Sequence, residues 1–236
     1  EDAPRTAGAA AETDTTLLVF PSRGLTLSEI FERHEDISAR MLHKLMALIS
    51  GRIRRTNLLI TEKTRWIEEL RRQTLNDKLT GLYNRTFLEE EFYGRFSEYG
   101  ERVAVLAVKP DNFKEINDSC GHDAGDRVLR MLADEVRSAV GVESTAVRYR
   151  GDEYMVILPD SGVREAAPVA GAIMERVAGL DTSAATGGVR VPITVSVGIA
   201  EFPADEQDPG SLVEQAFKRM WEARESGGDR TVPPAR

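Results

Sequence analysis

The stretch AVRYRGDEYMVILP, residues 146–159, contains the pattern that decides the fold. A single glycine, Gly151, stands with two adjacent acids, Asp152 and Glu153, between two apolar runs. Glycine and aspartate are common turn residues and the flanking runs are typical of strands, so the stretch predicts a β-hairpin. The acids at its tip, beside Arg150, have two explanations: an ordinary solvated turn or a functional site.

Outward from this hairpin, predicted strands and helices follow one another. The run VAVLAV is almost wholly apolar, as a buried strand would be, whereas ITVSVGIAEF alternates, which predicts a half-buried strand. In chain order we predict a strand at 103–108, a helix at 123–140, the hairpin strands at 145–149 and 154–158, a helix at 163–180, a strand at 193–202 and a helix at 209–224. This order predicts an α/β fold, an α+β sandwich rather than a purely parallel sheet.

The first third of the chain has a different character. Residues 1–24 begin with small polar residues and are predicted to be disordered or the remnant of an upstream domain, although 16–20 (TLLVF) suits a lone strand. Residues 25–75 are predicted to form a long helix or helix pair that serves as a dimerisation or signalling linker. Residues 76–236 are predicted to form the main domain.

The predicted helical segment has a repeating apolar face. Ile53, Ile60 and Ile67 are spaced seven apart, which suits a coiled-coil seam or a helix packed on a partner. Gly51 is the expected break between two helices, because glycine is a poor helix former.

Composition narrows the classes of function. The chain has 236 residues, a net charge of −8 and a pI of about 5.1, which argue against a general affinity for nucleic acid or anionic lipid. The single cysteine, Cys120, excludes an internal disulfide and suits a reducing cytoplasm. No apolar run reaches the length of about 20 residues that a membrane span needs. We therefore expect a cytoplasmic chain without a membrane segment, as a piece of a longer protein with an upstream sensory domain.

Four segments occur in a distinctive order. They are DKLTGLYNR at 77–85, KPDNFKEINDSCGHDAGD at 109–126, the hairpin, and AFKRMWEARESGGDR at 216–230. Together they resemble the GGDEF family, the diguanylate cyclases, over residues 76–232. The resemblance implies a fold like that of class III nucleotidyl cyclases, with a mostly antiparallel central sheet flanked by helices. Residues 20–57 also bear a distant resemblance to the closing helices of cyclic-nucleotide-binding regulatory domains.

The resemblance implies an activity with a metal requirement. Diguanylate cyclases join two GTP molecules into cyclic di-GMP and release pyrophosphate, and charge on the phosphoryl oxygens is stabilised by metal ions. By resemblance Asp152 and Glu153 are the catalytic and metal-binding acids, and the carbonyl of Pro110 aligns with a backbone metal ligand. The expected cofactor is Mg²⁺, with Mn²⁺ as a substitute, because carboxylates and phosphates are the ligands of such hard cations.

The resemblance also implies a GTP-binding set. Asn117 and Asp126 match the family's guanine readers, and an amide with a carboxylate suits the edge of that base. The segment whose backbone N–H groups hold the triphosphate corresponds to Asn112, Phe113 and Lys114. Gly151 permits close approach of substrate to the hairpin, and Arg224 stands where a phosphate-binding lysine is common.

Departures from the family pattern lie at the metal site. Lys109 stands where the family has a metal-binding aspartate, and an ammonium group has no lone pair for a metal. Arg150 replaces the first glycine of the hairpin motif and Tyr154 its phenylalanine. The upstream inhibitory Arg-x-x-Asp motif is absent, since Gly141 and Ser144 occupy its ends.

Three functions are therefore open. The first is an active diguanylate cyclase, in which Lys109 and Arg150 place positive charge near the triphosphate. The second is a catalytically degenerate GGDEF module that binds GTP or a protein partner as a signalling scaffold. The third is a structural dimerisation module built on the long helix. The active cyclase, working as a homodimer through the N-terminal helix, is the expectation from sequence.

Overall fold

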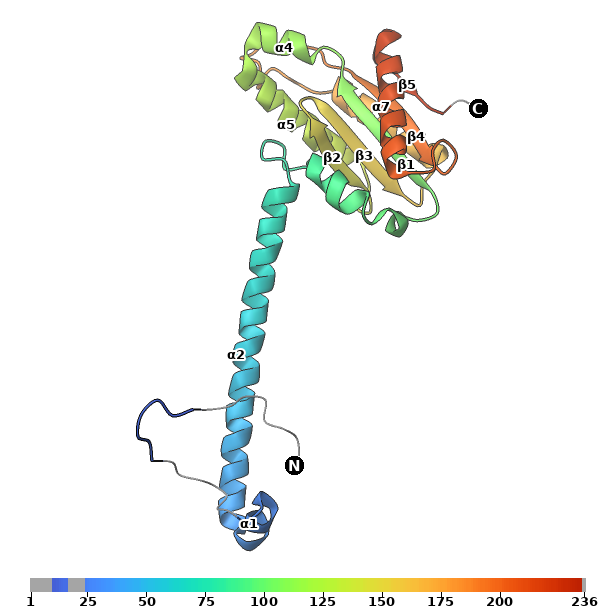
Figure 1. The fold of residues 1–236 in the computed structure, drawn as a ribbon. Coiled ribbons are helices and arrows are strands. Elements are labelled where there is room, and N and C mark those ends of the chain that lie inside the picture. The colour runs from blue at the N-terminus through green and yellow to red at the C-terminus, as the bar shows by residue number, and fades with distance from the viewer. Residues whose placement is uncertain (1–9, 17–23, 235–236) are drawn as a thin grey trace. The chain divides into compact units, whose positions relative to one another are not determined.

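The computed structural model describes residues 10–16 and 24–234 (Figure 1). The strand predicted at 16–20 lies, apart from its first residue, outside the described residues. Contacts divide the chain into a unit that ends at Trp66 and a second unit, Ile67–Arg236. In chain order the elements are α1 (Leu27–Arg33), α2 (Glu35–Leu75), α3 (Arg85–Phe87), η1 (Leu88–Phe92), η2 (Phe96–Tyr99), β1 (Val103–Pro110), α4 (Phe113–Cys120), α5 (His122–Ala139), β2 (Thr145–Arg150), β3 (Glu153–Pro159), α6 (Val163–Ala178), β4 (Val195–Phe202), α7 (Pro209–Glu225) and β5 (Thr231–Val232).

The helical segment begins at a capping box. The Thr26 hydroxyl accepts a hydrogen bond from the backbone of Glu29, and the Glu29 carboxylate accepts one from the backbone of Thr26. Helix α1 ends at its C-cap, His34. Helix α2 begins at Glu35 and runs without interruption through Gly51. The break predicted at Gly51 is therefore wrong. One glycine costs a helix only about 1 kcal/mol relative to alanine, which long flanking runs of good helix formers offset.

The second unit is built on one sheet with the strand order β2-β3-β1-β4-β5. The first three pairings are antiparallel and only β4 and β5 run parallel, which confirms the predicted mostly antiparallel sheet. Helix α7 crosses in front of β1 and β4 in Figure 1. The sheet is covered on both faces, and two apolar clusters fill the spaces between sheet and helices.

The two strands at the centre of the sheet show why it carries so much apolar sequence. In β1, Leu106 belongs to the cluster under α5 and α6, while Val105 belongs to the cluster under α7, so both sets of side chains are buried. The half-buried character predicted for 193–202 is wrong for the same reason. Ser196 is fully buried, and a Cβ added to Gly198 would collide with the backbone of α7, which lies directly against β4.

The tyrosine that replaces the hairpin phenylalanine has a hydrogen-bond partner. Tyr154 is fully buried, and its hydroxyl donates to the carbonyl of Leu129 in α5 over 2.9 Å. Burial raises the pKa of this hydroxyl, so it stays protonated and keeps donating. The hydroxyl that tyrosine adds in place of phenylalanine therefore has a hydrogen-bond partner inside the core, and this bond links β3 to α5.

A buried ion pair fastens α7 to the chain that follows β4. The guanidinium of Arg219 donates to both carboxylate oxygens of Asp205, over 2.7 and 2.8 Å, and to the carbonyl of Ile199 over 2.6 Å. The hydrogen bonds from Arg219 lower the pKa of the Asp205 carboxyl against the opposing effect of burial. The pair is bidentate, with Arg219 buried and Asp205 largely buried, and bidentate pairs of this kind are strong.

Candidate functional site

Strand pairing brings the first strand's end to the hairpin tip. Val108 of β1 lies opposite Tyr154 of β3 in the antiparallel register, so the next residue of β1, Lys109, lies beside the tip. A register shift between Arg148 and Arg150 interrupts the β2–β3 ladder, and Gly151 turns the chain with a φ of +53°. A positive φ is a conformation that glycine adopts without strain. The hairpin and β1 thus present their polar side chains at one edge of the sheet.

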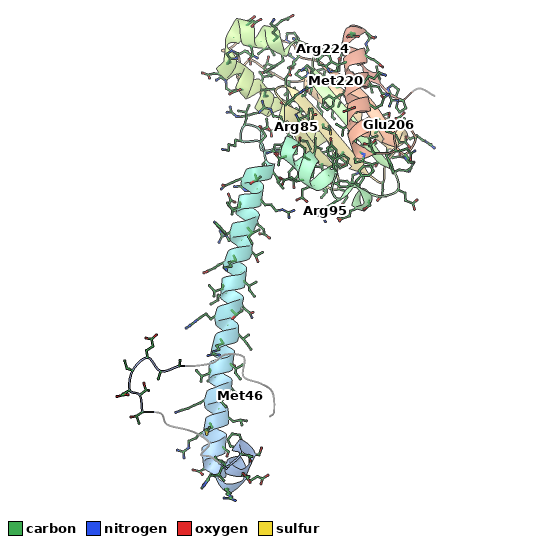
Figure 2. The ribbon with its side chains drawn as sticks, in the orientation of Figure 1. Met46, Arg85, Arg95, Glu206, Met220 and Arg224 are labelled. Atoms are coloured by element: carbon green, nitrogen blue, oxygen red, sulfur yellow. The ribbon has the colours of Figure 1, made fainter. Side chains whose placement is uncertain are left out.

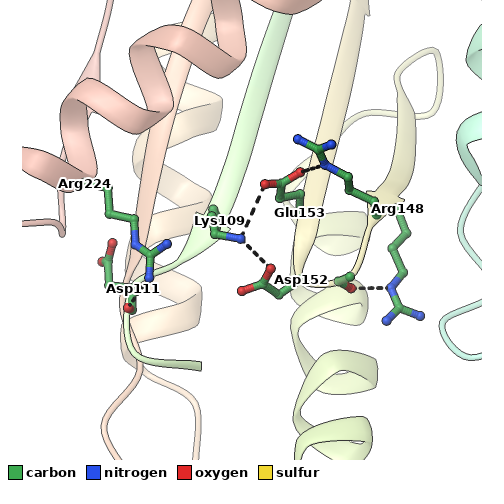
Figure 3. Close-up of polar contacts among 8 residues, drawn as sticks. Lys109, Asp111, Arg148, Asp152, Glu153 and Arg224 are labelled. Carbon is green, nitrogen blue, oxygen red and sulfur yellow. Dashed lines mark hydrogen bonds and ion pairs between the residues drawn. The ribbon is translucent and has the colours of Figure 1, made fainter. Parts of the chain in front are cut away.

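Four charged side chains meet at this edge, Lys109, Arg150, Asp152 and Glu153, which we call the Lys109 cluster. Figure 3 labels Lys109, Asp152 and Glu153 of this cluster. The Lys109 amine lies 2.5 Å from Asp152 Oδ1 and 3.5 Å from Glu153 Oε1. The second Glu153 oxygen accepts from Arg150 Nε over 2.7 Å. Lys109 is only 8% exposed and Glu153 only 4%. The hairpin acids are therefore neutralised by two side-chain cations of the same chain.

The last helix covers this cluster with an aromatic ring. The Lys109 amine lies 5.4 Å from the ring centre of Trp221, and the Arg224 guanidinium carbon lies at the same distance. Arg224 also donates to the carbonyl of Asp111 over 3.1 Å and projects from α7 (Figures 2 and 3). Cations near the face of a tryptophan ring are stabilised by its π-electrons. Trp221 therefore holds two positive side chains at the same edge of the sheet.

An arginine that the sequence did not single out ties the hairpin tip to the segment after α2. Arg148 donates to the carbonyl of Gly151 over 2.8 Å and to the carboxylate of Asp77 over 2.9 Å. Burial alone would raise the pKa of Asp77, but hydrogen bonds from Arg148 and Thr80 outweigh it and lower that pKa. The sequence did contain a signal for this role. Arg148 is a charged residue inside the predicted strand at 145–149, and a charged side chain that is partly buried needs a partner.

A pocket of about 260 Å³ lies beside the hairpin acids. Its lining combines residues of α4, α5 and the hairpin: Phe113, Lys114, Asn117, His122, Asp126, Leu129, Arg148, Gly151 and Asp152. Six of these are residues predicted to bind GTP or to act in catalysis. The pocket is therefore the place where an amide, a carboxylate and a lysine converge.

Close packing of α4 on α5 positions the pocket's amide. A Cβ added to Gly125 would lie 1.9 Å from Asn117 Oδ1, so only glycine lets the amide lie against α5 at this point. The remaining predicted residues, Pro110, Asn112, Glu153 and Arg224, do not line this pocket. Pro110 ends β1, and Asn112 precedes α4 and donates to the carbonyl of Pro192 over 2.5 Å. The buried Oδ1 of Asn112 has no protein partner.

These elements, in this order, are those of a known family. A family model described as "Diguanylate cyclase, GGDEF domain" matches residues 74–230. The chain belongs to the GGDEF family.

Curated relatives of this GGDEF chain include named cyclases. It is 33% identical over 164 residues to the response regulator PleD of Caulobacter vibrioides. The aligned region covers 68% of this chain and 36% of PleD. It is also 33% identical over 170 residues to diguanylate cyclase A of Treponema denticola, with 70% of the chain and 45% of that protein covered. The chain thus spans less than half the length of these relatives.

Solved structures show the same fold. The coiled coil and GGDEF domain of DgcB from Caulobacter crescentus, in complex with c-di-GMP, superposes with a TM-score of 0.68 at 25% identity. It covers 79% of this chain and 99% of that one. Diguanylate cyclase SiaD from Pseudomonas aeruginosa, in complex with its activator SiaC, gives 0.63 at 26% identity and covers 88% and 83% of the two chains. The GGDEF fold predicted from the motifs is confirmed.

The metal expected for the GGDEF domain does not fit its residues. The described part of the chain contains no group of three or more histidine, cysteine or acidic side chains that could hold a metal ion. Asp152 and Glu153 already hold the Lys109 amine, and a lysine ammonium cannot act as a ligand. A third acid, Asp111, lies two residues after Lys109 and already has other hydrogen-bond partners. Its carboxylate accepts hydrogen bonds from Ser196, Thr194 and the backbone of Asp229.

Proposed function

We propose that this GGDEF domain is a GTP-binding module of cyclic di-GMP signalling that does not join its nucleotides, because Lys109 takes the metal's place. The observation that supports this most directly is the bonding of one buried amine to both hairpin acids. An acid that holds a lysine this closely is not available to a metal or to a sugar hydroxyl. Under this proposal the domain still binds GTP, the family's substrate, but does not catalyse its condensation.

Guanine is assigned to the pocket between α4 and α5. The carboxylate of Asp126 accepts hydrogen bonds from the N1–H and N2–H groups of guanine, and the amide of Asn117 meets the same edge. Both side chains line the pocket. Adenine presents a different set of donors on this edge, so this pair favours GTP over ATP.

The triphosphate is assigned to the edge of the sheet. Lys114 and Asp152 both line the pocket. Arg224 lies near the Trp221 ring, as Lys109 does. The backbone N–H groups from Asn112 to Lys114 open α4, and the start of a helix favours phosphate groups. Gly151 leaves the hairpin tip open to the nucleotide, with no atom within 4 Å of an added Cβ.

Diguanylate cyclase activity is the second candidate. It is favoured by the guanine-reading pair and the two hairpin acids, together with relatives that carry the name of that enzyme. In this case Mg²⁺ or Mn²⁺ would displace the Lys109 amine from Asp152 and Glu153. Incubation with GTP and either metal, followed by chromatography of the products, separates the candidates. If the wild-type chain forms cyclic di-GMP, the proposal that it binds GTP without converting it is wrong.

Replacement of Asp126 tests the guanine assignment. We expect Asp126→Ala to weaken GTP binding by roughly 1–3 kcal/mol, because donors on the base lose their acceptor. The preference for GTP over ATP should narrow in the same variant. Calorimetric titration with each nucleotide measures both effects.

A matched control lies on the same helix. Asp123 is an exposed acid in the first turn of α5 and does not line the pocket. Asp123→Ala should leave both affinities unchanged. An Asp126→Ala protein that selects GTP over ATP as well as the wild type would remove Asp126 from the site.

The upstream helix is proposed to pair with a second copy. Ile53, Ile60 and Ile67 of α2 are each more than half exposed within their units, and β-branched residues spaced seven apart suit a two-stranded coiled coil. No helix among the described residues is long and apolar enough to cross a membrane. We place the domain in the cytoplasm, where GTP is found, downstream of a sensory domain.

Charges on the isoleucine face should dissociate the pair. We expect the double variant Ile53→Glu/Ile60→Glu to run as a monomer in light scattering at concentrations where the wild type is a dimer, because like charges meet across the seam. Leu58→Glu is the control, since Leu58 is 65% exposed but lies on another face of α2. A wild-type chain that is monomeric at high concentration would contradict the pairing.

A further inference from the structure

We propose that this GGDEF domain binds GTP without any divalent cation, because Lys109 and Arg150 replace the positive charge of the metal. The inference rests on the proposed function and adds a property of the site: no metal ion between the nucleotide and the hairpin acids is needed for binding. It is carried by the charge, burial and contacts of the Lys109 cluster.

The first argument is the balance of charge. A hairpin with two bare carboxylates would repel a triphosphate, and a metal normally removes that repulsion. Here Lys109 and Arg150 match Asp152 and Glu153 one for one. The four charges of the Lys109 cluster therefore balance before any ion binds. Arg224 and Lys114 then provide two further cationic side chains that can attract phosphate groups.

The second argument is that the lysine is difficult to displace. Its amine is bonded to two carboxylates, its exposure is 8%, and the Trp221 ring lies beside it. A metal that took its partners would leave a buried ammonium without counter-charge, which is strongly unfavourable. Magnesium also gives up its water ligands reluctantly. The amine therefore keeps the position when GTP and Mg²⁺ are both present.

The third argument concerns pre-organisation. Arg150 bonds Glu153 on the side away from Lys109, so both oxygens of that carboxylate are directed before the nucleotide arrives. Arg148 holds the hairpin tip by the carbonyl of Gly151. Glu153 and the hairpin tip are therefore ordered without a metal, and binding to an ordered group loses less entropy.

The test compares GTP binding by the whole chain in excess EDTA and in excess Mg²⁺. Calorimetric titration should give dissociation constants that agree within about threefold. Binding that appears only with Mg²⁺ or Mn²⁺ would overturn the inference while leaving GTP binding intact. A chain that binds GTP under neither condition would instead overturn the proposed function.

Variants of Lys109 separate charge from folding. Lys109→Met keeps the length of the side chain and removes its charge, so affinity in EDTA should fall by on the order of tenfold or more, and Mg²⁺ should restore part of it. Lys109→Arg keeps the charge and should bind in EDTA within about threefold of the wild type. The control is Lys218→Met, an exposed lysine on α7. Equal affinities of Lys109→Met and wild type in EDTA would refute the role of the amine.

Discussion

Lys109→Asp is expected to turn this domain into a magnesium-dependent GTP binder that forms cyclic di-GMP. The change removes the cation held by Asp152 and Glu153 and adds a third carboxylate at the end of β1. Two unit charges about 4 Å apart interact by about 4 kcal/mol at an effective dielectric constant of about 20. The gain in metal binding is therefore large even if solvent screening removes much of this energy. We expect Mg²⁺ to raise the variant's GTP affinity by on the order of 100-fold, about 3 kcal/mol.

The matched control is Lys109→Asn. It removes the same charge and has the same size as aspartate, but it adds no carboxylate, so it should respond less to Mg²⁺ and make no cyclic di-GMP. Product chromatography after incubation with GTP and Mg²⁺ compares the wild type with both variants. Product from the wild type, with a lower rate in Lys109→Asp, would show that the lysine supports catalysis and that the second candidate function is correct.

Loss of the buried arginine of α7 is expected to destabilise the domain most. Arg219→Met removes the cation from the largely buried Asp205 carboxylate, which keeps its hydrogen bond from the backbone of Glu201, and frees the carbonyl of Ile199. Removal of one member of a buried ion pair costs roughly 3–5 kcal/mol. Chemical denaturation at neutral pH measures the loss. The double variant Asp205→Leu/Arg219→Met is the control and should recover much of it, since no charge is then left unpaired.

The same ion pair predicts a pH dependence. The pKa of Asp205 is lowered in the folded state, so the carboxylate stabilises the fold fully above its unfolded pKa of about 3.9, and this stabilisation is lost as pH falls through the folded value. The wild type should therefore lose more stability than Asp205→Asn between pH 5 and about pH 3. Parallel losses in the two proteins over this range would contradict the assignment.

Most of the fold was predictable because local patterns and packing agree. The hairpin and the strand of β1 are marked by runs of apolar residues, and the order of helices and strands matches the predicted sandwich. The burial of β4 was not predictable from its alternation, because the residues between its apolar positions are small. Ser196 is fully buried and Gly198 lies directly against α7, a helix whose place over this strand is set by tertiary packing and not by the local sequence.

The candidate site was predictable in its members but not in its bonding. The motifs named Asn117, Asp126 and Asp152, and the structure places all three in the lining of one pocket. The sequence showed that Lys109 could not bind a metal, yet it could not show where the amine points. Lys109 and Glu153 are 44 residues apart, and only the register of β1 with β3 brings them together.

The segment that follows α2 also shields an edge of the sheet. Tyr83 donates to the carbonyl of Ala146 and accepts from the backbone of Arg148, so a stretch of loop occupies the outer side of β2. At the opposite edge, β5 has only two residues. Exposed strand edges invite the addition of foreign strands and hence aggregation. With one border occupied and the other very short, the sheet offers little template for the addition of a foreign strand.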